Sequence, residues 1–209
     1  MTSPQQWATA TFDGPGLLER SVGYTRTSLQ LVEDADLHAP TPCTRWDLLA
    51  LLRHMDDSLA AFTEAAAIGY VDLVPVPEGG TGSAVARTIV DRLRVRACAL
   101  LAAWSREPRG TDVAVADRML RSDLLAAAGA LEIAVHGWDV ARACGADRPL
   151  PTGLALELLP AVPLVVSDLD RPRRFAERLV VPPHATPQTR LLAALGRRAG
   201  QPRRRGSGR

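Results

Sequence analysis

Glu132, His136 and Asp139 are the residues whose types and spacing first indicate chemistry in this sequence. A separation of four residues places Glu132 and His136 one above the other on a single helix face, and Asp139 follows about one turn later. A carboxylate and an imidazole that face the interior of a helix bundle can bind a divalent metal. The same pair can instead form a buried hydrogen bond or a surface ion pair, so a metal site requires a ligand from a second element.

The element that must position these residues is a long helix predicted over 122–145. Apolar residues recur along it at helical spacing, namely Leu125, Ala128, Leu131 and Val135. We expect the Ser122 hydroxyl to cap the first turn, and we expect Gly145 to end the helix in the left-handed conformation. Gly137 lies beside His136 and would allow another backbone to approach closely.

A histidine on an earlier predicted helix offers the ligand from a second element. This helix begins near Trp46 and ends near Ile68, and its core positions are Leu48, Leu52, Met55, Leu59 and Phe62. His54 lies one position off that apolar stripe, where a histidine is commonly a core-edge residue rather than a ligand. Combined with Glu132 and His136, however, it completes a His₂Glu set that leaves one coordination position open, as catalytic zinc sites do.

Two more amphipathic helices are predicted over 15–34 and 83–105, which makes four helices before Gly145. The leading fold class is therefore mainly α, with a four-helix bundle over 1–145 and antiparallel neighbours. Three connectors containing Pro or Gly separate the helices: 36–45, 69–82 and 107–121. The connector 69–82 has an apolar alternation that is broken by prolines, so any strand there is an edge piece.

The pattern changes after Gly145, where residues 146–196 predict a short mixed C-terminal extension that packs on the bundle. Its predicted parts are a helix over 152–166 interrupted by prolines, a charged turn at 171–174, a short strand over 175–181, and a final helical turn or two over 188–196. Residues 197–209 contain only basic charges and predict a disordered, solvated tail.

The amino-acid composition makes some classes of protein function less compatible with this chain than others. Aromatic residues make up only 4% of the chain, so the core must be aliphatic and rich in Ala, which suits packed helices. The net charge of +2 is concentrated in the tail, so the body is mildly acidic and does not resemble a nucleic-acid-binding surface. The N-terminus lacks the features of a signal peptide, and no apolar run reaches membrane-spanning length. Three widely spaced cysteines without a CxxC motif fit a reducing cytoplasm.

Three segments resemble the DinB-like metal-binding bundles related to mycothiol-dependent maleylpyruvate isomerase. They are TPCTRWDLLALLRHMDDSLAAF (41–62), LEIAVHGWDVARACG (131–145) and FAERLVVPPHATPQTRLLAALGR (175–197). The stretch LEIAVHGWD is the specific part, and the resemblance covers most of the chain. It implies a DinB-like four-helix bundle in which His54, Glu132 and His136 bind a divalent metal, usually zinc.

The resemblance also implies a chemistry. Related proteins use mycothiol to isomerise maleylpyruvate, or they transfer low-molecular-weight thiols, because a metal with an open position lowers the pKa of a bound thiol. Asp57 and Asp139 are the candidate catalytic residues, as groups that orient the imidazoles or bind polar parts of a thiol, although either could be a solvated surface residue. Trp138 and Arg142 are candidate cofactor-binding residues, and Trp138 could equally be a core residue.

Three hypotheses remain open from the sequence. The first is a metal-dependent enzyme, a mycothiol-dependent transferase or isomerase whose partners are a small thiol and an electrophilic substrate. The second is a bundle that binds a metal or a small ligand without turnover, and the third is a structural helical dimer. No nucleic acid or membrane partner is expected, and the chain would be a monomer or a homodimer. Because the segment after Gly145 is shorter than the isomerase's second domain, we expect a substrate other than maleylpyruvate.

Overall fold

A computed structural model describes most of the chain. The described residues are 12–43, 46–68, 70–71, 83–106, 112–115, 118–171 and 175–200. Most of the predicted connector 69–82, residues 172–174 of the predicted charged turn 171–174, and the tail beyond residue 200 lie outside this part.

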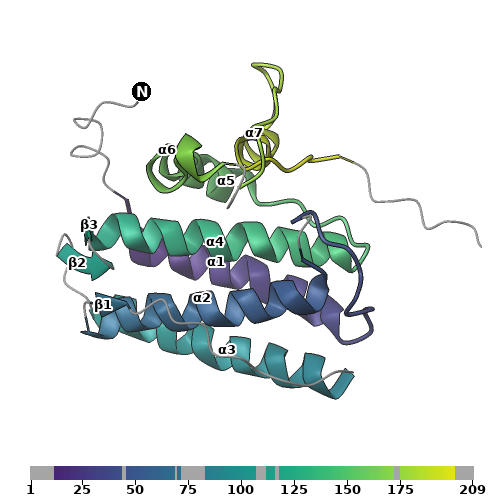
Figure 1. The fold of residues 1–209 in the computed structure, drawn as a ribbon, viewed down its shortest axis with the longest axis horizontal. Coiled ribbons are helices and arrows are strands. Elements are labelled where there is room, and N and C mark those ends of the chain that lie inside the picture. The colour runs from purple at the N-terminus through teal and green to yellow at the C-terminus, as the bar shows by residue number, and fades with distance from the viewer. Residues whose placement is uncertain are drawn as a thin grey trace, which may run out of the picture.

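Four long helices form the body of the molecule, as the sequence predicted (Figure 1). They are α1 (Gly14–Leu29), α2 (Leu48–Ile68), α3 (Ser83–Arg106) and α4 (Ser122–Ala143). Helix α1 packs along α4, and α2 packs against both α3 and α4. Their facing sides bury a continuous aliphatic core that includes Leu18, Leu52, Leu93 and Leu131. This packing confirms the four-helix bundle and supplies most of the stability of such helices.

The prediction of antiparallel neighbours is wrong for two packed helix pairs. Helices α1 and α4 run parallel, because Gly14 lies against Ala126 near the start of both helices and Thr25 donates to the Ile133 carbonyl further along both.

Helices α2 and α3 are parallel as well. Asp56 of α2 pairs with Arg92 of α3, and Phe62 accepts a hydrogen bond from Trp104, so the contacts advance in the same direction along both helices. The segment between Val71 and Ser83 can reach about 40 Å when extended, which exceeds the roughly 32 Å length of α2. The chain therefore has enough length to return to the start of the bundle before α3 begins.

A small three-stranded sheet closes one end of the bundle, next to the first turn of α4 (Figure 1). Strand β1 (Tyr70–Val71) pairs in parallel with β2 (Asp112–Val115), and β2 pairs antiparallel with β3 (Arg118–Arg121). The register places Asp112 opposite Arg121 and Val115 opposite Arg118. The sequence predicted only a connector over 107–121, because strands of four residues are too short to give a clear period-2 pattern.

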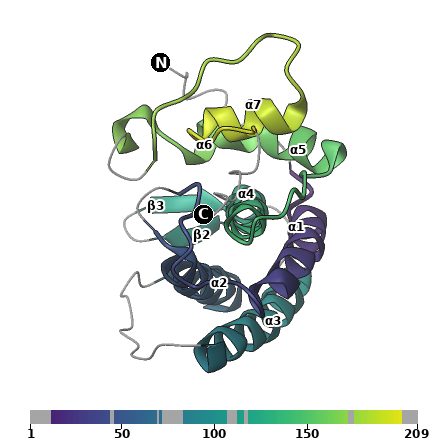
Figure 2. The same cartoon turned by 90° about the vertical axis from the view of Figure 1, so that its right-hand side faces the viewer.

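The C-terminal extension covers the side of the bundle formed by α4 and the start of α1 (Figures 1 and 2). It contains α5 (Thr152–Leu158), a 3₁₀ turn at Leu159–Ala161, α6 (Val162–Val165), a 3₁₀ turn at Asp168–Asp170, and α7 (Pro187–Ala194). The interruption near Pro160 and Pro163 matches the prediction. The predicted strand over 175–181 is wrong, because this segment is irregular and Leu179 donates to the Ala193 carbonyl instead of joining a sheet.

Helix α4 ends as predicted but begins differently. Gly145 has a φ of 75°, and the amides of Gly145 and Ala146 donate to the carbonyls of Arg142 and Ala141, which closes a Schellman motif. Ser122 is already helical, and Arg121 occupies the N-cap position instead, without a capping bond from its side chain. By length and composition α4 could cross a membrane, but 83% of its apolar window is buried in the protein, as in the core helix of a bundle.

Candidate metal centre

His54, Glu132 and His136 converge between α2 and α4. Their ligand atoms all lie within 4.8 Å of one another. Oε1 of Glu132 lies 2.5 Å from Nε2 of His54 and 3.2 Å from Nε2 of His136. The helical spacing of four residues stacks Glu132 on His136, and the packing of α2 on α4 brings His54 to the same carboxylate. The structure thus joins the three ligands that the sequence assigned to two separate helices.

Asp139 contacts Nδ1 of His136, the ring nitrogen that does not face Glu132. Its Oδ2 lies 2.9 Å from Nδ1 of His136, and both side chains are buried. The Asp139 carboxylate also accepts from Nε and Nη2 of Arg197, at 3.0 and 2.7 Å. Because an ionised carboxylate can only accept, Nδ1 of His136 carries the proton in this bond. Asp139 therefore fixes the ring so that Nε2 points toward Glu132.

Arg197 is a further residue of the centre, and its position could not be predicted from the sequence. Its assignment to a solvated tail is wrong, since the residue is 9% exposed and lies three residues after the end of α7. Its guanidinium is anchored by Asp139 and also donates to the Leu195 carbonyl. Nothing in the local sequence distinguishes Arg197 from the exposed Arg198 beside it, so only the position of α7 relative to α4 reveals its partner.

Two further side chains complete the surroundings of the three residues. The ring of Trp46 lies over His54, with centroids 4.3 Å apart, and is 5.9 Å from His136. The Ser58 hydroxyl donates to Oε1 of Glu132 at 3.2 Å. Both residues belong to the segment 41–62, but its helical pattern alone gave them no assigned role.

The structure places Asp57 at an exposed position of α2. Its neighbour Asp56 is the buried acid, and its two carboxylate oxygens lie 2.8 Å from Nε of Arg92 and of Arg96. Helix α3 therefore supplies two arginines to a buried carboxylate of α2. The catalytic roles assigned to Asp57 and Asp139 both stay predictions, although Asp139 forms the expected hydrogen bond with His136.

Trp138 and Arg142 contact each other on α4. Trp138 is 2% exposed, and the Arg142 guanidinium lies 5.8 Å from its ring centroid. Arg142 also donates to the Gly200 carbonyl and pairs with Asp147 at 3.5 Å. The structure does not bring these two residues to the three ligand candidates, so their role in cofactor binding remains an expectation from sequence.

Burial and neighbouring charges shift the pKa values of Glu132 and His136 in opposite directions. Burial favours the neutral form of Glu132, but the charge and hydrogen bonds of His136 and the hydrogen bond of His54 outweigh it and hold the pKa of Glu132 well below its usual value. Burial likewise disfavours the charged form of His136, yet Glu132 and Asp139 raise its pKa to about 9. The metal-free centre is thus an ionised carboxylate between imidazoles, with His136 protonated at neutral pH.

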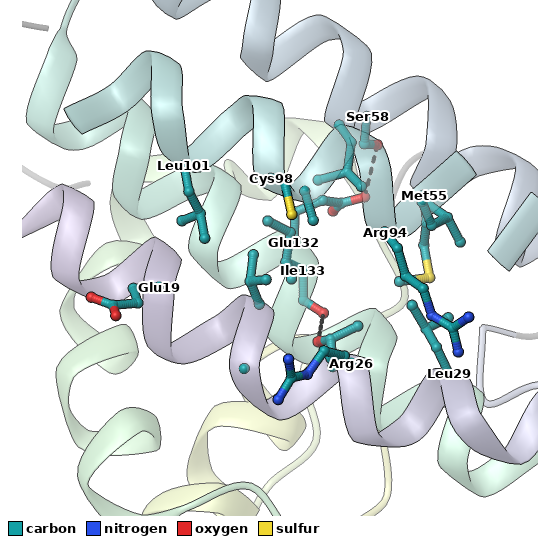
Figure 3. Close-up of a pocket in the computed structure, with 16 residues that line it drawn as sticks. Glu19, Arg26, Leu29, Met55, Ser58, Arg94, Cys98, Leu101, Glu132 and Ile133 are labelled. Carbon is teal, nitrogen blue, oxygen red and sulfur yellow. Dashed lines mark hydrogen bonds between the residues drawn. The ribbon is translucent and has the colours of Figure 1, made fainter. Parts of the chain in front are cut away.

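Glu132 also lines a cavity of about 470 Å³ between the four helices (Figure 3). The close-up shows Ser58 bonded to Glu132 at one wall, with Met55 of α2, Cys98 of α3 and Ile133 of α4 nearby. The centre is therefore reached from the bundle side through this cavity, and the Glu132 side chain is 26% exposed. A small molecule in the cavity would touch the carboxylate directly.

Gly137 explains how α1 approaches the centre. A Cβ at this position would collide with the Thr25 side chain of α1. Thr25 lies there because its hydroxyl donates to the Ile133 carbonyl at 2.8 Å. The predicted close approach beside His136 is confirmed, but a side chain rather than a backbone makes it.

The family model described as the mycothiol maleylpyruvate isomerase N-terminal domain matches residues 18–141. This match covers more than half of the chain. The chain belongs to this family. No curated protein and no solved structure matches the chain. The matched region of this isomerase N-terminal domain contains His54, Glu132, His136 and Asp139, whereas Arg197 lies outside it.

The donor set of this isomerase-type domain is compatible with a divalent ion. Ligand atoms bound to one zinc at 2.0–2.1 Å and tetrahedral angles lie about 3.4 Å apart. The 3.2 Å between Glu132 and His136 is close to that value, and an ion would replace the direct hydrogen bond between Glu132 and His54. Asp139 occupies Nδ1 of His136 and leaves Nε2 available, which is the usual support of a metal-binding histidine.

Proposed function

We propose that this protein binds a divalent metal, zinc in the simplest case, through His54, Glu132 and His136, and that it is an enzyme acting on a low-molecular-weight thiol such as mycothiol. The convergence of the three ligand atoms within 4.8 Å carries this proposal. The membership of the isomerase N-terminal domain family supports the choice of thiol. A reducing cytoplasm would keep that thiol available, and the three cysteines, all within the described residues, form no disulfide.

Each side chain of the proposed centre has its own role. Two imidazoles and one carboxylate hold the ion, and they leave it a position for a fourth ligand. When bound, the ion would supply a Lewis acid that lowers the pKa of a coordinated thiol toward neutrality. Asp139 keeps His136 in the productive tautomer, and Trp46 shields the face of His54 from water. The thiol would then add to the electron-poor carbon of a small substrate, giving thiol transfer or thiol-assisted isomerisation.

Metal content of purified variants tests the metal centre. We expect one zinc per chain in the wild type, and occupancy reduced at least about tenfold in His54→Ala and in His136→Ala, since each removes a ligand. His38→Ala and His184→Ala are matched controls, because both histidines are exposed and lie in connectors. Plasma mass spectrometry after dialysis gives the stoichiometry. Equal loss in all four variants would show that the metal binds non-specifically.

Cobalt substitution tests the thiol step. Mycothiol added to cobalt-loaded wild type should produce a sulfur-to-metal charge-transfer band. Glu132→Gln preserves the side-chain volume, so we expect it to fold but to bind cobalt weakly and to show no such band. A cobalt-loaded wild type whose spectrum no thiol perturbs would contradict the enzyme and favour a bundle that binds metal without turnover.

A further inference from the structure

The cavity beside Glu132 has apolar walls. Its buried members come from all four helices and are Leu29, Met55, Leu59, Leu93 and Ile133. The buried hydroxyl of Thr25, which also lines the cavity, is already bonded to the Ile133 carbonyl at 2.8 Å. A ligand therefore meets hydrocarbon along these walls, and burying its own apolar surface there is favourable.

Glu132, one of the three proposed ligands, forms part of the cavity wall. The contacts from His54, His136 and Ser58 on Glu132 all fall on Oε1. Glu132 and Ser58 line the cavity, and the Glu132 side chain remains partly exposed to it. A molecule held against the apolar walls would thus place one part next to the proposed metal.

The exposed rim of the cavity carries more positive than negative charge. Its charged members are Arg26 of α1, Arg94 of α3 and Glu19 of α1. In the view of Figure 3, Arg94 and Glu19 lie toward opposite ends, and Arg26 lies between them. Arg94 also pairs with Asp91 at 2.8 Å, but its side chain is 46% exposed and can reorient. Arginines at the rim of an apolar cavity favour a carboxylate on the ligand.

We propose that this cavity binds the apolar part of a carboxylate-bearing molecule, whose carboxylate lies at Arg26 and Arg94. The inference rests on the proposed function, because it names the substrate class: an apolar electrophile with one carboxylate, whose reactive carbon faces Glu132. The volume of about 470 Å³ is within the range of small-molecule sites. Binding of the carboxylate-bearing molecule itself does not require the metal.

Octanoate is the probe that tests the cavity. Calorimetric titration of the metal-free wild type should show one site, and Gly23→Leu should weaken it at least about tenfold by filling the opening. Gly23 lines the cavity, and a Cβ there meets nothing within 4 Å, so the variant should fold. Gly153→Leu is the matched control, because its Cβ is equally unobstructed but lies on α5. Unchanged octanoate affinity in Gly23→Leu would overturn the proposal.

A second variant tests the interaction of the ligand carboxylate with a rim arginine, separately from the shape of the cavity. Arg26→Gln should weaken octanoate binding about two- to fivefold, as expected for an exposed charge pair, and should leave 1-octanol binding unchanged. Arg190→Gln, an exposed arginine on α7, should change neither. Equal binding of octanol and octanoate by the wild type would overturn the assignment of a carboxylate.

Cys98 provides a measurement on the unmodified protein. It is exposed and lines the cavity, whereas burial raises the pKa of Cys144 to about 11 and slows its alkylation. Saturating octanoate should slow alkylation of Cys98 by iodoacetamide at least about threefold, and 1 M salt should partly reverse this protection. Alkylation at the same rate with and without octanoate would contradict binding in the cavity.

Octanoate binding by a protein that takes up no zinc would refute the metal centre alone, and zinc uptake without octanoate binding would refute the cavity alone.

Discussion

At the scale of single residues, His136 shows how the centre is prepared for a metal. Its Nδ1 donates to buried Asp139, and its Nε2 faces the Glu132 carboxylate at 3.2 Å. Without a metal, a proton on Nε2 compensates the carboxylate, which is why the pKa of His136 rises to about 9 although burial opposes its charge. Metal and proton therefore compete for the same nitrogen atom.

This competition predicts the pH dependence of the metal-free protein. Because the folded-state pKa of His136 lies above its unfolded value of about 6.5, its stabilising effect is complete below pH 6.5 and is lost as pH rises through 9. We expect the free energy of unfolding to fall by a few kcal/mol over that range, measured by urea denaturation in the presence of a chelator. In His136→Gln this fall should be much smaller. A profile for His136→Gln that parallels the wild type would contradict the assignment.

At the scale of elements, the central fact is the close contact of α1 with α4. Gly137 leaves room for Thr25, whose hydroxyl ties α1 to the Ile133 carbonyl one turn before His136. The sequence alone indicated a close approach at Gly137 but not its partner, because periodicity identifies a buried face without saying which helix covers it. For the same reason the parallel pairings of α1 with α4 and of α2 with α3 could not be predicted.

Gly137→Ala tests this contact. Alanine has the higher helix propensity, but its methyl group would collide with Thr25, so we expect the substitution to destabilise the protein by about 1–3 kcal/mol. Gly153→Ala is the control, since its Cβ has open space, and it should be neutral or stabilising by up to about 1 kcal/mol. Thermal or urea denaturation compares the two. Stabilisation by both substitutions would show that α1 and α4 are not closely packed here.

At the scale of the whole molecule, the C-terminal extension takes part in the centre. The four helices could be predicted from sequence, because amphipathic periodicity is a local signal. The spacing of Glu132 and His136 is also local, and the structure brings His54 next to them, but their binding of a metal stays a prediction. The salt bridge from Arg197 to Asp139 joins residues that are 58 positions apart, so no local pattern encodes it. The hairpin of β2 and β3 was missed because its strands are short.

Arg197→Met should reveal this support. It leaves the buried Asp139 carboxylate without its guanidinium partner, so we expect a loss of about 3 kcal/mol in the free energy of unfolding. Zinc affinity should also fall by about 10- to 100-fold, because Asp139 would no longer be held against His136. Arg198→Met, at the adjacent exposed residue, should leave both quantities unchanged. Equal behaviour of the two variants would show that the extension does not support the centre.

X-ray absorption at the zinc edge of the loaded wild type tests the central claim most directly. We predict two imidazole nitrogens at about 2.0–2.1 Å with carboxylate and water oxygen, and no sulfur until mycothiol is added. A sulfur scatterer at about 2.3 Å should then appear. Sulfur in the first coordination shell before any thiol is present, or fewer than two imidazoles, would contradict a centre built from His54, Glu132 and His136.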